Sequence, residues 1–363
     1  MNVALIHDYL ENKGGAEAVF EKLIELFPKA EKYTLFHDKS KVLKKVSMHT
    51  SFIQKIPFKD YRKLVALFPL AVSSLRVPKK TEIILSSSHA FAKGIRKNKG
   101  AIHICYCHTP MRYAWDMYED YLKNENISIA FKIGFPIAMA VIRKWDYFTA
   151  KKVDYFIANS KNVQERIKKY YRKESTVIYP PVRTKFFTPQ KKNEGFYLIV
   201  SRLVSMKRID IAVDACTQLN KKLVIVGGGR ELERLKKIAG KTVEFKGELP
   251  DEEVRDYYRR CKAFIFTSND DFGITPVEAQ ACGKPVIAFA KGGALETVIE
   301  GKTGHFFSEQ TSPSLIKGIK EFEEMSLSSK ECRKNARRFD EEVFKQKMMS
   351  FIQEKYKENV EKR

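Results

Sequence analysis

The most specific chemical motif of this 363-residue chain joins two carboxylates to a predicted helix start. Asp270 and Glu278 stand eight positions apart, and Gly273-Ile274-Thr275 opens the helix between them. Backbone N–H groups at a helix start have no acceptor within the helix and attract phosphate. Glu278 would lie about one turn into that helix, where its carboxylate could accept hydrogen bonds from a ribose. The spacing therefore predicts a nucleotide-binding loop.

Two cations bracket another predicted loop between a strand and a helix. Arg202 and Lys207 are five positions apart, so both could reach one diphosphate, Arg202 through two oxygens and Lys207 as a point charge. The alternative is that both are ordinary solvated cations of a basic chain. The next predicted strand ends in Gly227-Gly228-Gly229, which would permit a close approach of the backbone to a ligand.

The first half of the chain carries two weaker signals. Gly14 and Gly15 precede a predicted helix and could admit an anion, although a plain turn explains them equally well. Their spacing is not G-x-G-x-x-G, so a nicotinamide dinucleotide is not favoured. His108 stands at the carboxyl end of a predicted strand, with Thr109 and Pro110 expected to cap and open a helix. A histidine in this place has either a functional or a structural role.

The elements that must position these residues form two series. Short apolar runs alternate with amphipathic helical patterns, which is typical of βαβ units and parallel sheets. A polar stretch at 188–195 divides the series, so we expect Rossmann-like domains at 1–188 and 189–340, with a C-terminal helix at 341–363 that docks on the first. Ligands of such sheets bind beyond the carboxyl ends of the strands. The predicted strands are Val3–His7, Tyr33–Phe36, Glu82–Ser87, Ile102–His108, Tyr155–Asn159, Thr176–Tyr179, Tyr197–Ser201, Lys222–Val226, Val243–Lys246, Ala263–Thr267 and Pro285–Phe289.

The charge of the chain is strongly basic and unevenly distributed. The formal net charge is +23, and the segment 39–100 alone has fifteen Lys or Arg residues against Asp60 and Glu82. A basic surface suits nucleic acid, anionic lipid or phosphorylated small molecules. No signature of a nucleic-acid-binding module accompanies the charge, so nucleic acid is the weakest of the three interpretations.

Several motifs that are absent from the sequence restrict the class of protein. No D-x-D metal motif occurs, and six cysteines without a C-x-x-C pair predict reduced thiols rather than a metal site. The N-terminal residues do not have the pattern of a signal peptide, so we expect a cytoplasmic protein. The apolar segment 127–142 is too short to span a membrane and is interrupted by Lys132 and Pro136, which predicts a buried or interfacial helix.

Together these motifs resemble retaining glycosyltransferase family 4, whose members have the GT-B fold of two Rossmann-like domains facing a cleft. The resemblance covers nearly the whole chain. The segment 106–115, YCHTPMRYAW, is most similar to the mannosyltransferase branch that builds bacterial O-antigen and exopolysaccharide.

The resemblance implies roles for individual residues. Arg202 and Lys207 would stabilise the diphosphate leaving group, and Glu278 would bind the ribose. Asp270 replaces the first glutamate of the family motif and is one methylene shorter. The catalytic residues that it implies are His108, Arg202, Lys207 and Asp270. The implied donor-binding residues are Gly14, Gly15, Arg202, Lys207, Gly228, Lys246, Phe272, Gly273, Ile274, Thr275 and Glu278.

The resemblance also implies a reaction. The expected donor is a nucleotide-sugar, GDP-mannose first, and the expected acceptor is a lipid-linked saccharide at the cytoplasmic membrane, with no metal cofactor. An enzyme that uses a UDP- or ADP-sugar, whether a glucosyltransferase or an epimerase, is the alternative. Apolar and basic residues mix at 55–59 and 61–68, which would suit the surface of an anionic membrane. A solvated basic face explains this mixture equally well.

Overall fold

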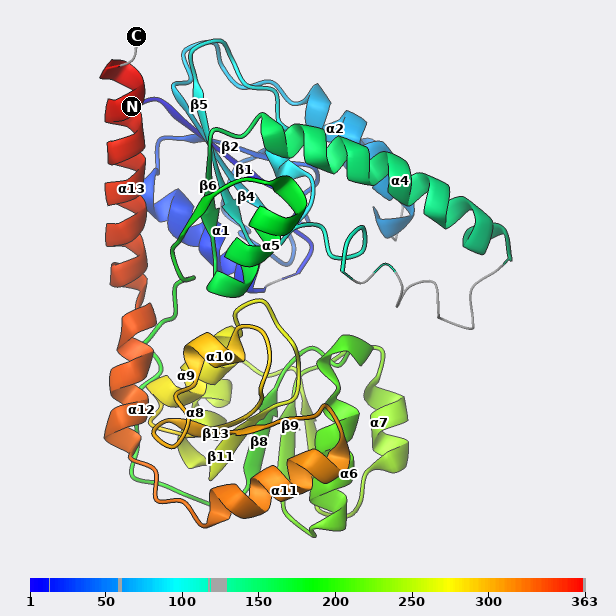
Figure 1. The fold of residues 1–363 in the computed structure, drawn as a ribbon, viewed down its shortest axis with the longest axis vertical. Coiled ribbons are helices and arrows are strands. Elements are labelled where there is room, and N and C mark those ends of the chain that lie inside the picture. The colour runs from blue at the N-terminus through cyan, green and yellow to red at the C-terminus, as the bar shows by residue number, and fades with distance from the viewer. Residues whose placement is uncertain (13, 58–60, 117, 119–128, 362–363) are drawn as a thin grey trace. The chain divides into compact units, whose positions relative to one another are not determined.

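The computed structural model describes residues 1–12, 14–57, 61–116, 118 and 129–361, which form two compact units (Figure 1). The first unit comprises Met1–Tyr179 together with Lys345–Arg363, and the second comprises Pro180–Phe344. Each unit is a parallel sheet with helices packed on it, so the predicted α/β class with two Rossmann-like domains is confirmed.

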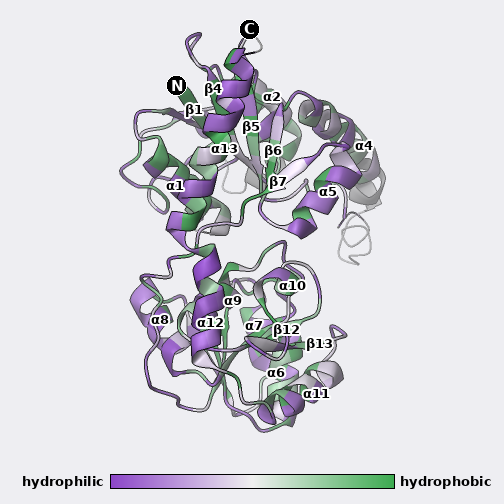
Figure 2. Cartoon of the chain, turned by 60° about the vertical axis from the view of Figure 1, so that its left-hand side comes forward, coloured by the Kyte–Doolittle hydropathy of each residue, from purple (hydrophilic) through white to green (hydrophobic). Residues whose placement is uncertain are grey.

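Seven strands form the sheet of the first unit, in the order β3-β2-β1-β4-β5-β6-β7. The central strands β4 and β5 are buried along their whole length, as expected of parallel strands covered on both faces. These strands are mainly hydrophobic, whereas the surface helix α12 of the second unit (Ser329–Ala336) is mainly hydrophilic (Figure 2). The strands of the first unit are β1 (Val3–His7), β2 (Glu31–Thr34), β3 (His49–Thr50), β4 (Ile83–Ser88), β5 (Ile102–Cys107), β6 (Tyr155–Ala158) and β7 (Ser175–Val177).

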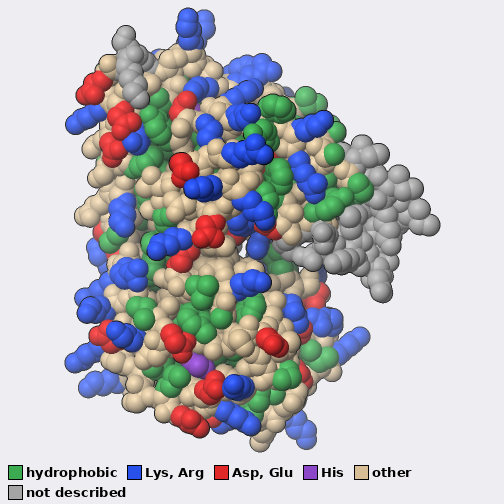
Figure 3. All heavy atoms as spheres, viewed as in Figure 1, with side chains coloured by type: hydrophobic (Ala, Val, Ile, Leu, Met, Phe, Trp, Pro, Cys, Tyr) green, Lys and Arg blue, Asp and Glu red, His purple; other side chains and the backbone are tan. Residues whose placement is uncertain are grey.

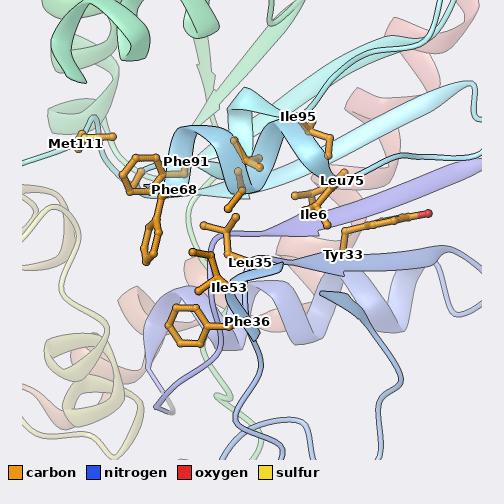
Figure 4. Close-up of a cluster of buried hydrophobic side chains, with 14 of the residues drawn as sticks. Ile6, Tyr33, Leu35, Phe36, Ile53, Phe68, Leu75, Phe91, Ile95 and Met111 are labelled. Carbon is orange, nitrogen blue, oxygen red and sulfur yellow. The ribbon is translucent and has the colours of Figure 1, made fainter. Parts of the chain in front are cut away.

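An aromatic and aliphatic core fixes the loop that follows β4. Phe68 lies edge-on to Phe91, with 5.1 Å between the ring centroids, and both side chains are buried (Figure 4). Because Phe91 belongs to the segment directly after β4, this packing holds that segment against the sheet. The helices of the first unit are α1 (Gly15–Leu26), η1 (Phe52–Lys55), η2 (Tyr61–Leu67), α2 (Phe68–Ser74), η3 (Ala92–Gly94), α4 (Ile129–Lys151) and α5 (Lys161–Tyr171).

The C-terminal helix α13 (Glu341–Glu361) contributes most of its length to the first unit. Its Tyr356 Oη donates to Glu82 Oε1 at 2.6 Å, and its Lys345 Nζ lies 2.9 Å from Glu25 Oε2. These contacts tie the end of the chain to α1 and to the start of β4.

Six strands form the sheet of the second unit, in the order β10-β9-β8-β11-β12-β13. Helices α6, α7 and α11 pack on one face, and α8, α9, α10 and α12 lie on the other (Figure 1). The strands are β8 (Tyr197–Val200), β9 (Leu223–Val226), β10 (Val243–Gly247), β11 (Ala263–Phe266), β12 (Val286–Phe289) and β13 (Gly304–Phe307). The helices are η4 (Ser205–Lys207), α6 (Ile209–Gln218), α7 (Leu232–Ile238), α8 (Asp251–Arg260), α9 (Ile274–Ala281), α10 (Ala294–Thr297), α11 (Ser312–Glu323), α12 (Ser329–Ala336) and η5 (Arg337–Phe339).

The structure differs from the sequence prediction in local detail. Each sheet has one edge strand that was not predicted, β3 and β13, because both are too short or too polar to stand out as apolar runs. Thr109 and Pro110 do not open a helix; they lie in an irregular segment after β5, and Thr109 Oγ1 accepts a hydrogen bond from Arg166 at 2.7 Å. The first unit ends at Tyr179 rather than 188, because Val182 N bonds Phe339 O at 2.9 Å within the second unit.

The apolar segment predicted at 127–142 falls largely within α4, although residues 127 and 128 lie outside the described residues. Among the residues that the structure describes, no helix is both long enough and apolar enough to cross a bilayer.

Candidate functional site

In the second unit, the structure brings together two of the residues singled out by sequence. Lys207 ends η4, in the loop after β8, and Asp270 lies in the loop after β11. Lys207 Nζ is 2.5 Å from Asp270 Oδ2, and both side chains remain about one-fifth exposed. Thr267 Oγ1 donates to the carbonyl of Lys207 at 2.8 Å and so ties the two loops together. Because β8 and β11 are adjacent parallel strands, both loops lie at the carboxyl ends of the strands, side by side.

The helix start predicted beside Asp270 is present. Helix α9 begins at Ile274, and Gly273 precedes it with φ of 83°, a conformation that favours glycine. A Cβ at Gly273 would also lie 2.9 Å from the ring of Phe266. The N-cap residue Gly273 provides no side-chain cap, and the amides of Ile274 and Thr275 at such a helix start suit an anion.

Glu278 lies on α9 and accepts a hydrogen bond from a buried tyrosine. Tyr258 Oη donates to Glu278 Oε2 at 3.0 Å. Burial raises the pKa of Tyr258 well above its usual range, and the charge of Glu278 adds to this shift. The phenol therefore stays protonated and fixes one carboxylate oxygen. Phe272 is buried against Phe339, with ring centroids 5.4 Å apart, which leaves its backbone rather than its side chain for a ligand.

The glycines after β9 are required by the neighbouring backbone. A Cβ at Gly227 would lie 1.9 Å from the carbonyl oxygen of Ser201, and one at Gly229 would lie 2.3 Å from that of Leu203. Leu203 N also donates to Gly228 O at 2.8 Å. This close packing shapes the loop that presents Arg202. The Arg202 side chain is exposed and has no hydrogen-bond or ion-pair partner within the described part of the chain.

Lys246 lies apart from this group. It is on the edge strand β10, two strands away from β8, and its Nζ is 2.9 Å from Glu244 Oε2. None of the contacts that tie Lys207 to Asp270 involves it.

One element of the site, the double glycine after β12, was not predicted from the sequence. After β12, Gly293 N donates to Asp270 O at 2.9 Å, and a Cβ at Gly293 would lie 2.2 Å from Phe272 Cα. Gly292 has φ of 63° and packs just as closely on Asn269. The signal was available, because a double glycine between a strand and a helix repeats the pattern of Gly14 and Gly15.

In the first unit, a buried carboxylate organises the corresponding edge of the sheet. Asp8 follows β1 and accepts backbone N–H bonds from His89, Ala90, Phe91 and Ala92 at 2.5–2.9 Å. Burial alone would raise the pKa of Asp8. The charges of His89 and His7 and these N–H bonds outweigh burial, so the pKa is lowered. Asp8 is therefore an anion that anchors the segment after β4.

His108 lies within hydrogen-bonding distance of β4. Its Nε2 is 2.7 Å from Ser87 Oγ, and the side chain is buried. Burial lowers the pKa of His108 well below its usual range, and the charges of His7 and His89 act in the same direction. His108 is thus a neutral imidazole. Neither Ser87 nor His7 was predicted from the sequence, although polar residues that end apolar strands were a signal for both.

Gly14 and Gly15 lie at the start of α1, and Gly14 precedes the helix with no side-chain cap. A Cβ at Gly14 would approach Glu17 Oε2 to 2.8 Å. The predicted residues are therefore divided between the units. Arg202, Lys207, Gly228, Asp270, the start of α9 and Glu278 belong to the second, and Gly14, Gly15 and His108 belong to the first.

Residues 182–339 match the family described as glycosyl transferases group 1. The matched segment includes both loops joined by Lys207 and Asp270, together with all of α9. The group 1 segment thus covers most of the second unit.

Curated relatives of the chain are glycosyltransferases at low identity. An uncharacterized glycosyltransferase of Methanocaldococcus jannaschii is 30% identical over 172 residues, which are 45% of this chain and 48% of that one. A GDP-mannose-dependent phosphatidylinositol monomannoside mannosyltransferase of Mycolicibacterium smegmatis is 36% identical over 29% of this chain and 32% of its own. An alpha-1,3/1,6-mannosyltransferase of Dictyostelium discoideum is 22% identical over 84% and 86%. The chain spans about half the length of the first relatives that it matches.

Solved structures share the fold of this chain. Anabaena HepE in complex with UDP-glucose superposes with a TM-score of 0.72 at 19% identity and covers 98% of this chain and 100% of that one. Sucrose-phosphate synthase from Thermosynechococcus elongatus gives 0.75 at 17% identity and covers 98% and 99%. These likenesses support the GT-B class of fold that the motifs suggested.

Proposed function

We propose that the protein is a glycosyltransferase that moves a sugar from a nucleoside diphosphate to an acceptor hydroxyl. The observation that carries the proposal is the position of Lys207 and Asp270 beside the uncapped start of α9. Breaking a sugar–diphosphate bond leaves new negative charge on the departing phosphate. Fixed cations and helix amides stabilise that charge more strongly in the transition state than in the ground state.

Each donor contact is assigned to a side chain or amide of the second unit. Lys207 and Arg202 bind the diphosphate, the amides of Ile274 and Thr275 bind its oxygens, and Glu278 accepts bonds from the ribose. Asp270 orients Lys207 and lies on the side of the transferred sugar. We propose that these groups stabilise the leaving group without a metal cofactor, with retention at the anomeric carbon and with the donor phosphate taking the acceptor proton.

GDP-mannose is the proposed donor. Two relatives are mannosyltransferases by name, and one of them is GDP-mannose-dependent. A UDP-sugar is the second candidate, because the Anabaena structure of the same fold holds UDP-glucose. The deciding experiment incubates the protein with a panel of GDP-, UDP- and ADP-sugars in EDTA and detects hydrolysis or transfer by mass. Turnover of GDP-mannose alone supports the proposal, turnover of a UDP-sugar alone selects the alternative, and turnover of none rejects both.

The proposed acceptor is a lipid-linked saccharide on an anionic membrane at the cytoplasmic side. In the first unit, Leu70 of α2 and Val141 and Phe148 of α4 expose more than half of their side chains. Figure 3 shows Lys and Arg side chains interspersed with hydrophobic ones around α2 and α4, and those near α2 come from neighbouring segments because α2 itself has no Lys or Arg. This mixture suits an interface in which apolar groups enter the headgroup region and cations meet anionic lipid.

A further inference from the structure

Four buried or nearly buried groups of the first unit form a chain that ends at His108. Glu17 Oε1 lies 3.8 Å from His7 Nε2, and His7 Nδ1 lies 3.0 Å from Ser87 Oγ. Ser87 Oγ in turn lies 2.7 Å from His108 Nε2. The members come from α1, β1, β4 and the end of β5, so four elements of the unit position one line of contacts.

The single proton of Ser87 couples the two histidines. A hydroxyl donates once, so Ser87 donates either to His108 or to His7. The carboxylate of Glu17 faces His7 Nε2 and favours a proton on that nitrogen. If His7 is neutral, its Nδ1 must accept from Ser87, and Ser87 must then accept Nε2–H from His108. If His7 is doubly protonated, its Nδ1 donates to Ser87, and Ser87 donates to His108 Nε2.

The two states give His108 opposite characters toward a ligand. The side chain of His108 makes no other hydrogen bond among the described residues, so Nδ1 is its nitrogen for an incoming oxygen. With His7 neutral, Nδ1 of His108 is an acceptor. With His7 protonated, it carries the proton and is a donor.

We propose that Glu17, His7 and Ser87 are positioning residues that set the tautomer of His108 through the protonation of His7. The consequence for a sugar hydroxyl rests on the proposed function and on the catalytic role that the family resemblance implies for His108. Protonation of His7 then converts His108 from an acceptor of that hydroxyl's proton into a donor to its oxygen.

The surroundings of His7 are compatible with both states. Phe20 of α1 stacks on its ring at 4.8 Å between centroids, and the rings of His89 and His108 lie 6.2 and 6.3 Å away. Asp8 and Glu17 are the anions on this side, and both hold lowered pKa values against the opposing effect of burial. Asp8, Glu17, His89 and His108 are therefore the titratable groups that face His7.

The test is direct observation of the ring nitrogens in protein labelled with ¹⁵N-histidine. When the pH is lowered and His7 gains its second proton, the His108 proton should move from Nε2 to Nδ1. Ser87→Ala should abolish this coupling, and Ser87→Thr should retain it. Ser86→Ala is the matched control, because Ser86 Oγ bonds His103 Nε2 at 2.8 Å from the same two strands. The control should leave His108 unchanged.

The outcomes separate this proposal from the proposed function. A His108 tautomer that stays constant across the titration overturns the relay, and so does coupling that survives in Ser87→Ala. In turnover assays, Ser87→Ala should alter the pH profile of kcat/KM while Ser86→Ala should not, and identical profiles overturn the link to the sugar. If the coupling is present and no nucleotide-sugar is turned over, the relay stands and the proposed function fails.

Discussion

Lys207 and Asp270 lie 63 positions apart in the sequence, yet their side chains form a 2.5 Å ion pair at one edge of the second sheet. The pair connects the loop after β8 to the loop after β11. It holds a cation beside the start of α9, where an anion is already favoured by the helix amides. Lys207 is thus fixed before a donor binds, and this preorganisation is what stabilisation of a leaving phosphate requires.

Removing a cation from this edge should abolish most of the transfer. We expect Lys207→Ala and Arg202→Ala each to lower kcat by roughly 100-fold to 1000-fold, as loss of one fixed stabilising donor does elsewhere. Rates of donor hydrolysis or transfer in EDTA provide the measurement. Lys222→Ala is the control, since Lys222 also pairs with a carboxylate, Glu244 at 3.0 Å, before β9. Full activity in both cation variants would be incompatible with the proposed role.

Glu278 should affect donor binding more than chemistry. Removing the charge of a carboxylate that accepts hydrogen bonds from a ribose should weaken donor binding by roughly 2 kcal/mol. Glu278→Gln should therefore raise KM for the donor about 10-fold to 100-fold. Glutamine keeps an oxygen for the phenol of Tyr258. Tyr258→Phe separates the two effects, because it keeps the charge and removes only the positioning bond. An unchanged KM in Glu278→Gln argues against the ribose contact.

The buried carboxylate of Asp8 should make stability depend on pH. Because its folded-state pKa is lowered, Asp8 stabilises the folded state above its unfolded pKa, which is about 4, and that stability is lost as the pH falls through the folded pKa. Asp8→Asn cannot accept all four N–H bonds, so it should cost roughly 3 kcal/mol at neutral pH. Urea unfolding at pH 7 and at about pH 3.5 measures both effects. The difference in the free energy of unfolding between wild type and variant should be smaller at about pH 3.5 than at pH 7. An equal difference at the two pH values contradicts the assignment.

The sequence predicted the architecture of each unit and some of the residues of the candidate site. Apolar runs such as those of β4 and β8 located the strands, because parallel strands buried on both faces are continuous in hydrophobicity. The helix start at Ile274 followed from Gly273 and the carboxylate spacing. The double glycine at Gly293 and the polar end of β4 at Ser87 were visible in the sequence, but their partners, Asp270 and His108, lie in distant segments that the sequence does not pair with them. The glycines at 227 and 229 were explained by a ligand, whereas the backbone of the Arg202 loop is what requires them.

The exposed apolar side chains of α2 and α4 should bind anionic membranes. A triple variant, Leu70→Ser with Val141→Ser and Phe148→Ser, removes three such side chains without touching the core, so its folded state should keep the stability of wild type. Burial of each apolar side chain contributes about 1.5–3 kcal/mol, so binding should weaken by more than 10-fold. Co-sedimentation with vesicles of anionic lipid measures it, with neutral vesicles in parallel. Leu295→Ser in α10 is the control, because Leu295 is just over half exposed but lies in the second unit. Equal binding of wild type to both kinds of vesicle excludes recognition of the anionic surface, and unchanged binding of the triple variant excludes this apolar patch.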